Sequence, residues 1–136
     1  MIKKSITYTD FNGSEVTEDF YFHMTDAEIL KLECSEKGGL TTIINNISNE
    51  TDPKIIFNIF ERVIRMAYGR RSLDGSSFLK KPEYADAFLA SEAYSQMFME
   101  FMQNPDNFAD FFKGLTSSVQ ARTKNDRQKF ELVESE

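Results

Sequence analysis

The sequence has no tryptophan, one cysteine and one histidine, and these shortages exclude several kinds of site. Cys34 alone forms neither an internal disulfide nor a cysteine-rich metal site. A site built on two histidines is excluded because His23 stands alone. No glycine pattern leads from a strand into a helix as nucleotide-binding loops require. We therefore predict that the chain needs no metal or cofactor.

Long apolar runs are also missing. Lys3 and Lys4 near the start are not followed by the apolar segment of a secretory signal. No window approaches the roughly 18 apolar residues of a membrane span. The net charge of −6, from 22 acidic and 16 basic residues, would repel a phosphate backbone. We expect a cytosolic protein that binds neither membranes nor nucleic acid.

Phenylalanine is abundant, with 13 residues, and is accompanied by five tyrosines and six methionines. This much apolar material in 136 residues is enough for one domain with a core of its own. We predict an α+β fold over residues 1–115, in which an N-terminal β-hairpin packs on a mostly helical body. Residues 116–136 are polar and are predicted to form a mobile tail.

The hairpin is predicted over residues 2–22. Residues 2–9 and 15–22 are rich in Ile, Thr, Val, Tyr and Phe, and Asn12-Gly13 lies in the turn between them. A two-stranded hairpin is marginally stable by itself, so it must pack on another element.

Several helices follow, each with recognisable start or stop residues. Thr25 and Glu28 form a capping box, and Asp52-Pro53 combines an N-cap carboxylate with proline at the first helical position. Gly69 is predicted to end the helix that starts there, and Gly114 the last one. We predict a loop over 70–79, in which Asp74-Gly75 could instead close a tight hairpin. The predicted helices are 26–37, 40–47, 53–68, 82–89, 91–103 and 105–114.

Residues that could carry catalysis are few. Cys34 and His23 come from different elements with no orienting motif, so we predict a packed, inert cysteine and a histidine at a strand end. Acidic pairs are interpreted as solvated surface. No catalytic residue is predicted. Arg70 and Arg71, part of a cluster with Arg62 and Arg65, are candidate contacts between subunits.

Residues 88–112 combine phenylalanine and methionine at helical spacing. Flexible methionine beside phenylalanine is typical of surfaces that bind varied apolar helices. The alternative is that these residues fill the core, and we favour it for most of them, with Met99 and Phe112 evenly balanced between core and partner. The candidate partner-binding residues are Tyr94, Met97, Phe98, Met99, Phe101, Met102 and Phe112.

Four strings, in this order and spacing, resemble the tail assembly chaperones of long-tailed bacteriophages over roughly residues 5–115. They are the segments 20–28 (FYFHMTDAE), 67–71 (AYGRR), 74–81 (DGSSFLKK) and 91–100 (SEAYSQMFME). None of these strings is catalytic.

The resemblance implies a protein that forms homo-oligomers and coats the tape measure protein until tail-tube subunits polymerise around it. It also implies action in the host cytoplasm, absence from the mature virion and, in many members, a longer product of ribosomal frameshifting. The alternatives are a structural tail or head-tail joining subunit that stays in the virion, and a small enzyme or ligand-binding domain.

Overall fold

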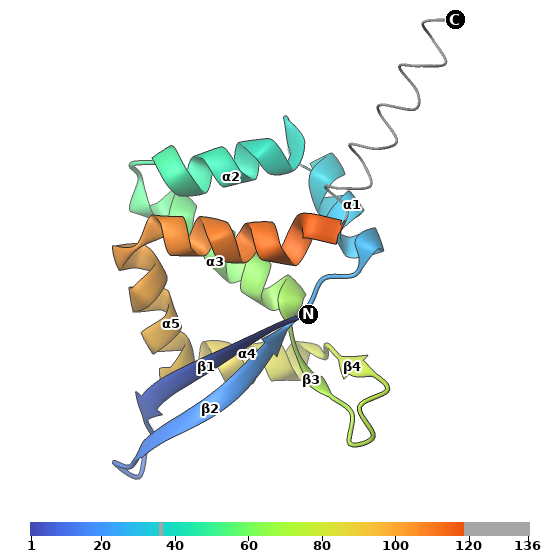
Figure 1. Ribbon diagram of the computed structural model, residues 1–136. Helices are drawn as coiled ribbons and strands as arrows, with labels where there is room; N and C mark the ends of the chain where they lie inside the picture. The colour runs from blue at the N-terminus through green and yellow to red at the C-terminus, as the bar shows by residue number, and fades with distance from the viewer. Residues whose placement is uncertain (36, 119–136) are drawn as a thin grey trace, which may run out of the picture.

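The computed structural model describes residues 1–35 and 37–118 and confirms the α+β prediction (Figure 1). Strands β1 (Ile2–Thr9) and β2 (Glu15–Phe22) have the predicted bounds and pair antiparallel, with Ile2 opposite Phe22. Gly13 in the turn has a φ of +82°, the left-handed conformation that favours glycine. The turn of the hairpin lies at the lower end of the molecule in Figure 1.

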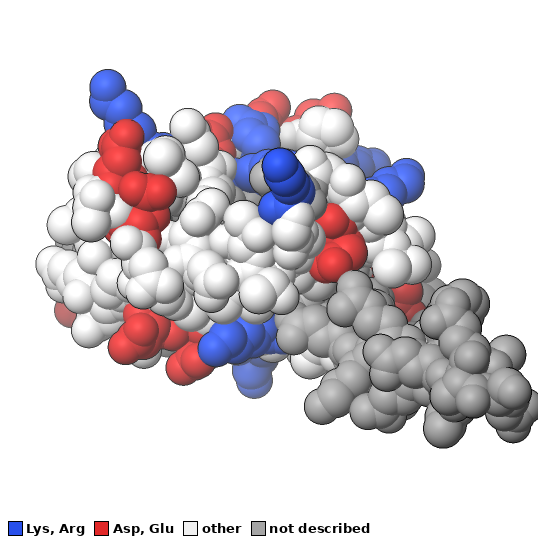
Figure 2. Space-filling view, turned by 90° about the horizontal axis from the view of Figure 1, so that it is seen from above, with Lys and Arg blue, Asp and Glu red and all other residues white. Residues whose placement is uncertain are grey.

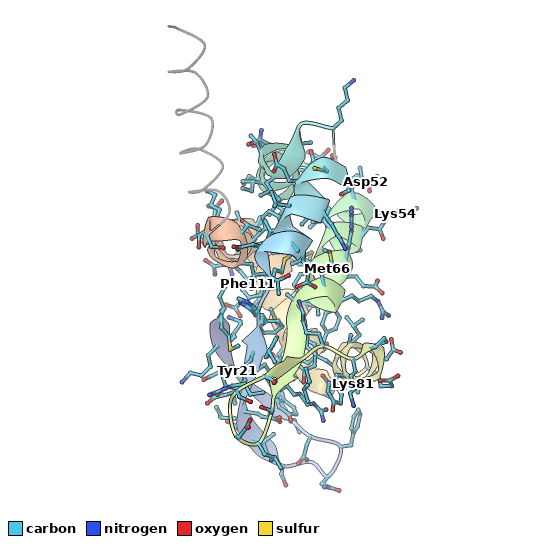
Figure 3. The ribbon with its side chains drawn as sticks, turned by 90° about the vertical axis from the view of Figure 1, so that its right-hand side faces the viewer. Tyr21, Asp52, Lys54, Met66, Lys81 and Phe111 are labelled. Carbon is cyan, nitrogen blue, oxygen red and sulfur yellow. The ribbon has the colours of Figure 1, made fainter. Side chains whose placement is uncertain are left out.

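The predicted helix starts are confirmed. The Glu28 amide donates to the Thr25 hydroxyl, and the Thr25 amide donates to the Glu28 carboxylate. The Asp52 carboxylate accepts from the Lys54 amide, and both residues mark the start of the long central helix in Figure 3. The labelled helices are α1 (Asp26–Ser35), α2 (Gly39–Asn49), α3 (Pro53–Ala67), α4 (Pro82–Leu89) and α5 (Glu92–Gln103).

The predicted end of the long helix, at Tyr68, is one residue late, and the predicted loop over 70–79 is wrong where residues 70–71 and 78–79 form strands. Helix α3 ends at Ala67, and β3 (Tyr68–Arg71) pairs with both β2 and β4 (Phe78–Leu79) in a sheet of order β1-β2-β3-β4. The alternative hairpin around Asp74-Gly75 is the correct one, with Gly75 at a φ of +77°. Gly69 is needed for space, since a Cβ there would lie 2.6 Å from the Leu79 carbonyl oxygen.

The last helix begins at Pro105 as predicted but does not end at Gly114. Residues 105–118 are helical, and Leu115 and Thr116 are buried. The Thr116 hydroxyl donates to the Phe112 carbonyl at 3.0 Å, so a polar residue continues the helix without an unpaired group. The predicted mobile tail therefore does not include residues 116–118, and its remainder lies outside the described residues.

The core lies between the sheet and the helices and is rich in aromatic rings. Phe22 of β2 contacts Phe88 of α4 at 5.8 Å and Phe111 at 5.3 Å between ring centroids. Phe60 of α3 contacts Phe108 at 5.0 Å, and both are fully buried. Helix α3 thus contributes to the core through Phe60.

Helix α1 buries Ile29 and Leu32, whereas 48% of Leu30 is exposed. Cys34 was expected to be packed and is exposed.

Lys80 connects the end of β2, helix α3 and helix α1. Its ammonium group donates to the carbonyl oxygens of His23 at 2.9 Å and Met66 at 2.8 Å, and it forms an ion pair with Glu28. Burial raises the pKa of Glu28, but hydrogen bonds from Lys80 and Thr25 more than offset this effect, and the pKa lies below its ordinary value. Lys80 therefore fixes the end of β2 and of α3 to the start of α1.

Candidate functional site

Helix α5 carries most of the predicted partner-binding residues, and its start is well defined. Ser91 is the N-cap, and its hydroxyl oxygen accepts from the Tyr94 amide at 3.2 Å. Ion pairing fixes the helix to β1, since Lys4 Nζ lies 3.1 Å from Glu100 Oε2. The helix therefore presents one flank to the core and another away from it.

The inner flank of α5 belongs to the core. Met97 and Phe101 are buried, and Phe112 of the helix 105–118 is fully buried in the same apolar cluster. Phe101 stacks on Phe108 with 5.5 Å between ring centroids. In this structure a partner cannot reach Met97, Phe101 or Phe112. The alternative interpretation, that these residues fill the core, fits their positions.

The outer flank of α5 is more accessible. Tyr94, Phe98 and Met102 are half-buried, and 49% of Met99 is exposed. Phe57 of α3, of which 39% is exposed, contacts Phe98 at 5.1 Å between ring centroids. We call these five residues the α3/α5 edge.

Sequence reasoning did not include Phe57 in the site. The available signal was the excess of apolar positions on α3, which cover more of the helix than one core-facing stripe needs. A tertiary contact was required to show that the excess on α3 adjoins the excess on α5.

Polar groups near the edge are paired or protonated. Burial, aided by the Glu61 carboxylate, raises the pKa of Tyr94 to about 12, so its phenol stays neutral at physiological pH. Arg65 bridges Glu61 at 3.4 Å and Asp86 at 2.8 Å. The apolar edge is thus bordered by an ion-pair network on α3 and α4.

Arg70 and Arg71 lie on β3, on the sheet side of the molecule. The Arg70 guanidinium lies 4.4 Å from the Tyr84 ring centroid and the Arg71 guanidinium 5.9 Å from that of Tyr21. Cation–π contacts of this kind hold the two arginine heads at the surface. Neither of these contacts involves a residue of the α3/α5 edge.

Within residues 1–35 and 37–118, no group of three His, Cys, Asp or Glu side chains is placed to hold a metal ion. Burial lowers the pKa of His23, whose ring contacts Phe78 edge to face. The Asp74 pKa falls to about 2 because the Ser72 hydroxyl and the Ser76 amide and hydroxyl donate to its carboxylate within a turn. None of the described helices has the length and apolar content of a membrane-spanning segment.

A family model of phage tail assembly chaperones matches residues 1–135. The match covers nearly the whole chain, including the hairpin, all described helices and the α3/α5 edge. No curated protein matches the sequence, and no solved structure matches it.

Proposed function

The chain belongs to the phage tail assembly chaperone family, and from this premise we propose that it binds the tape measure protein and keeps it soluble until the tail tube polymerises. The single observation that supports this is the α3/α5 edge, an apolar surface that the fold leaves partly uncovered. Binding would be stoichiometric and would need no cofactor, nucleotide or catalytic residue.

The chemistry of the edge suits an apolar helix as client. Phe57 and Phe98 provide ring surface, while Met99 and Met102 have flexible thioether side chains that adapt to varied partners. A helical client would place side chains at i, i+3, i+4 and i+7 against such a surface. The acidic net charge of −6 would keep the complex soluble.

We also propose that the chaperone acts in the host cytoplasm, forms a homo-oligomer and leaves before the virion is complete. Arg70 and Arg71 remain candidate oligomer contacts. The tail-tube protein would displace the chaperone from the client, and a longer frameshifted form would share residues up to the point where the two reading frames diverge. These proposals come from the family resemblance, and the edge supports only client binding.

Co-expression with the tape measure protein tests the function. The wild-type chain should bring the client into the soluble fraction, and Met99→Asp should reduce the soluble client severalfold because it places a charge in the apolar contact. Leu30→Asp is the matched control, since Leu30 and Met99 have nearly equal exposure, 48% and 49%, but Leu30 lies on α1. Both variants should keep wild-type stability within roughly 0.5 kcal/mol, as surface substitutions usually do.

Two results would contradict the proposal. If Met99→Asp and Leu30→Asp solubilise the client equally well, the α3/α5 edge is not the binding surface. If mass spectrometry finds the chain in purified virions at a fixed number of copies, the structural-subunit alternative replaces the chaperone function.

A further inference from the structure

Strands β2 and β3 share only two residue pairs, and the sheet divides beyond them. The pairs join residues 21–22 of β2 to residues 68–69 of β3, and the following residues of β3 pair with β4 instead. The turns of the two hairpins are separated at the lower side of the molecule in Figure 1. A cleft of about 720 Å³ lies between residues 18–21 and residues 68–75. We call this cleft the sheet fork.

Backbone groups of β2 at the fork lack a strand partner within the described part of the chain. Tyr21 pairs with β3, and the His23 amide donates to the Ala67 carbonyl at 2.8 Å. Because successive residues of a strand direct their backbone groups to alternate edges, Asp19 and Thr17 direct theirs to this same side. At these positions β3 has turned away to pair with β4. The amides and carbonyls of Thr17 and Asp19 therefore form a free edge that can accept one more strand.

The side chains along this free edge are mainly acidic. Glu18 and Asp19 line the fork, and Glu15 precedes them on β2. Hydroxyl groups of β1 donate to the Glu18 and Asp19 carboxylates and hold them at the edge. The two arginines on the opposite wall lie near tyrosine rings. Two copies that paired edge to edge would place carboxylates opposite carboxylates, which destabilises a sheet. The edge therefore favours an occupant with positive charge over a second copy of β2.

The end of the molecule around α2 attracts such an occupant less. Helix α2 contains no charged residue, and the view from above shows an uncharged surface at the centre of this end (Figure 2). Complementary charge raises the local concentration of a binding segment at one surface relative to another. A basic segment is therefore drawn to the β2 edge in preference to the α2 end.

The chain itself contains a segment with the chemistry that this edge requires. Residues 129–133, which lie outside the described residues, have the sequence KFELV, in which Phe130 and Leu132 alternate with Lys129 and Glu131. Such alternation is typical of a strand with one apolar face. The ten residues before this segment include three basic side chains and one acidic side chain, Arg122, Lys124, Arg127 and Asp126. The positive charge of this region thus lies at and before Lys129.

The described chain ends at a point from which this segment can reach the fork. The Ser118 hydroxyl donates to the Asp26 carboxylate at 2.9 Å. Seven residues of chain separate Asp26 from Asp19, which is at most about 25 Å. Residues 119–128 span roughly 33 Å when extended, so they can bring Lys129 to Asp19. A covalent link of this length also gives the segment an effective concentration that a separate molecule lacks.

We propose that residues 129–133 add to the free edge of β2 in the sheet fork as a strand antiparallel to β2. Lys129 lies beside Asp19 in this register, and Phe130 and Leu132 lie on the same side of the sheet as Phe20. The amides of Lys129 and Glu131 face β2. This inference goes beyond the proposed function and involves no residue of the α3/α5 edge.

Amide hydrogen exchange of the full chain, followed by NMR without any client, tests the added strand. Glu131→Pro removes an amide that faces β2, so the amides of Thr17 and Asp19 should exchange roughly tenfold or more faster in this variant than in the wild type. Glu134→Pro is the matched control, because it makes the same change of residue and charge just outside the segment, and its exchange should resemble the wild type. The amides of Glu18 and Phe20 face β1, so they should be unchanged in both variants and show that the fold is intact.

Charge exchange tests the register. Lys129→Asp places a carboxylate beside Asp19 and should speed exchange of the Thr17 and Asp19 amides. Asp19→Lys should do the same, because two ammonium groups then lie side by side. The double variant restores an opposite pair and should recover most of the protection. A double variant with no more protection than either single variant would overturn this register.

Three further results would overturn the inference. Rapid exchange of the Thr17 and Asp19 amides in the wild type would show that the edge is free. Protection that survives Glu131→Pro would show that a different segment occupies the edge. Protection that is lost on dilution would show that the strand comes from a second molecule. Because no client is present, each of these results leaves the proposed binding of the tape measure protein untouched.

Discussion

The two flanks of α5 contain the same kinds of residue and have different environments. Met97 and Phe101 on the inner flank are buried, whereas Phe98 and Met102 on the outer flank are half-buried and Met99 is exposed. Composition and helical spacing do not separate them. The difference arises because β1 and the helix 105–118 cover the inner flank, whereas Phe57 and Phe60 of α3 contact the outer flank at Phe98 and leave it partly exposed.

The ring of Phe101, on the inner flank, is buried and enclosed by other side chains. Phe101 lies within 5.5 Å of Phe60, Phe108 and Phe111 between ring centroids, and Lys4 Nζ lies 5.2 Å from its centre. Interiors are close-packed, so removing one of these rings leaves a cavity that neighbours fill only in part. The outer flank has solvent on one side and no such constraint. The two flanks should therefore respond very differently to truncation.

The largest effect is expected for Phe101→Ala. It should lower the free energy of unfolding by about 3 to 5 kcal/mol, the usual cost of removing a buried phenylalanine ring. Chemical denaturation measures this loss, with Met99→Ala as the control on the outer flank, where a change within roughly 0.5 kcal/mol is expected. Equal losses in the two variants would show that the flanks do not differ as described.

A smaller loss of stability, which affects both flanks of α5, is expected for Ser91→Ala. The Ser91 hydroxyl accepts from the Tyr94 amide and donates to the Phe88 carbonyl at 2.6 Å, so it orders the start of α5. Loss of an N-cap costs about 1 kcal/mol. Ser91→Thr, which keeps a capping hydroxyl, should retain most of the stability in thermal unfolding. A loss as large as that of Phe101→Ala would mean that Ser91 does more than cap the helix.

The smallest effect on stability concerns Tyr94, on the outer flank of α5, and depends on pH. Burial, followed by the Glu61 carboxylate, raises its pKa from 10.0 to about 12 in the folded chain. The folded state thus holds the phenolic proton more tightly than the unfolded chain. Its contribution to stability is complete below pH 10 and is lost as the pH rises through about 12.

Tyr94→Phe tests this dependence. The variant has no phenolic proton at this site, so its stability should fall less than that of the wild type between pH 10 and 12. The phenolate absorbance of the wild type, minus that of the variant, should show one tyrosine ionising near the upper end of this range. Ionisation near pH 10 would mean that the Tyr94 phenol is solvated in the folded chain and that the outer flank covers it less than described.

The elements whose ends are fixed by local chemistry were predictable from the sequence. The hairpin bounds follow from two β-rich segments separated by Asn12-Gly13, and the start of α3 from Asp52-Pro53. Capping boxes, N-cap carboxylates and turns depend on residues within three or four positions of each other. Such signals act in the same way whatever the rest of the chain does.

Errors occurred where a distant segment decided the result. Gly69 resembled a helix stop, but the approach of Leu79 makes it a strand residue that has no room for a side chain. Gly114 resembled another stop, yet the helix continues to residue 118 with Leu115 buried. Cys34 was expected to be packed but is exposed.

The sequence by itself determined the α+β class, the hairpin, the helix starts and the resemblance to the family. Only the tertiary structure decided which of the many phenylalanine and methionine residues are core and which form the α3/α5 edge. The physical reason is that the hydrophobic effect is non-directional: it favours burial of every apolar side chain. Which ones are buried depends on the packing of segments far apart in the chain, and no local pattern contains that information.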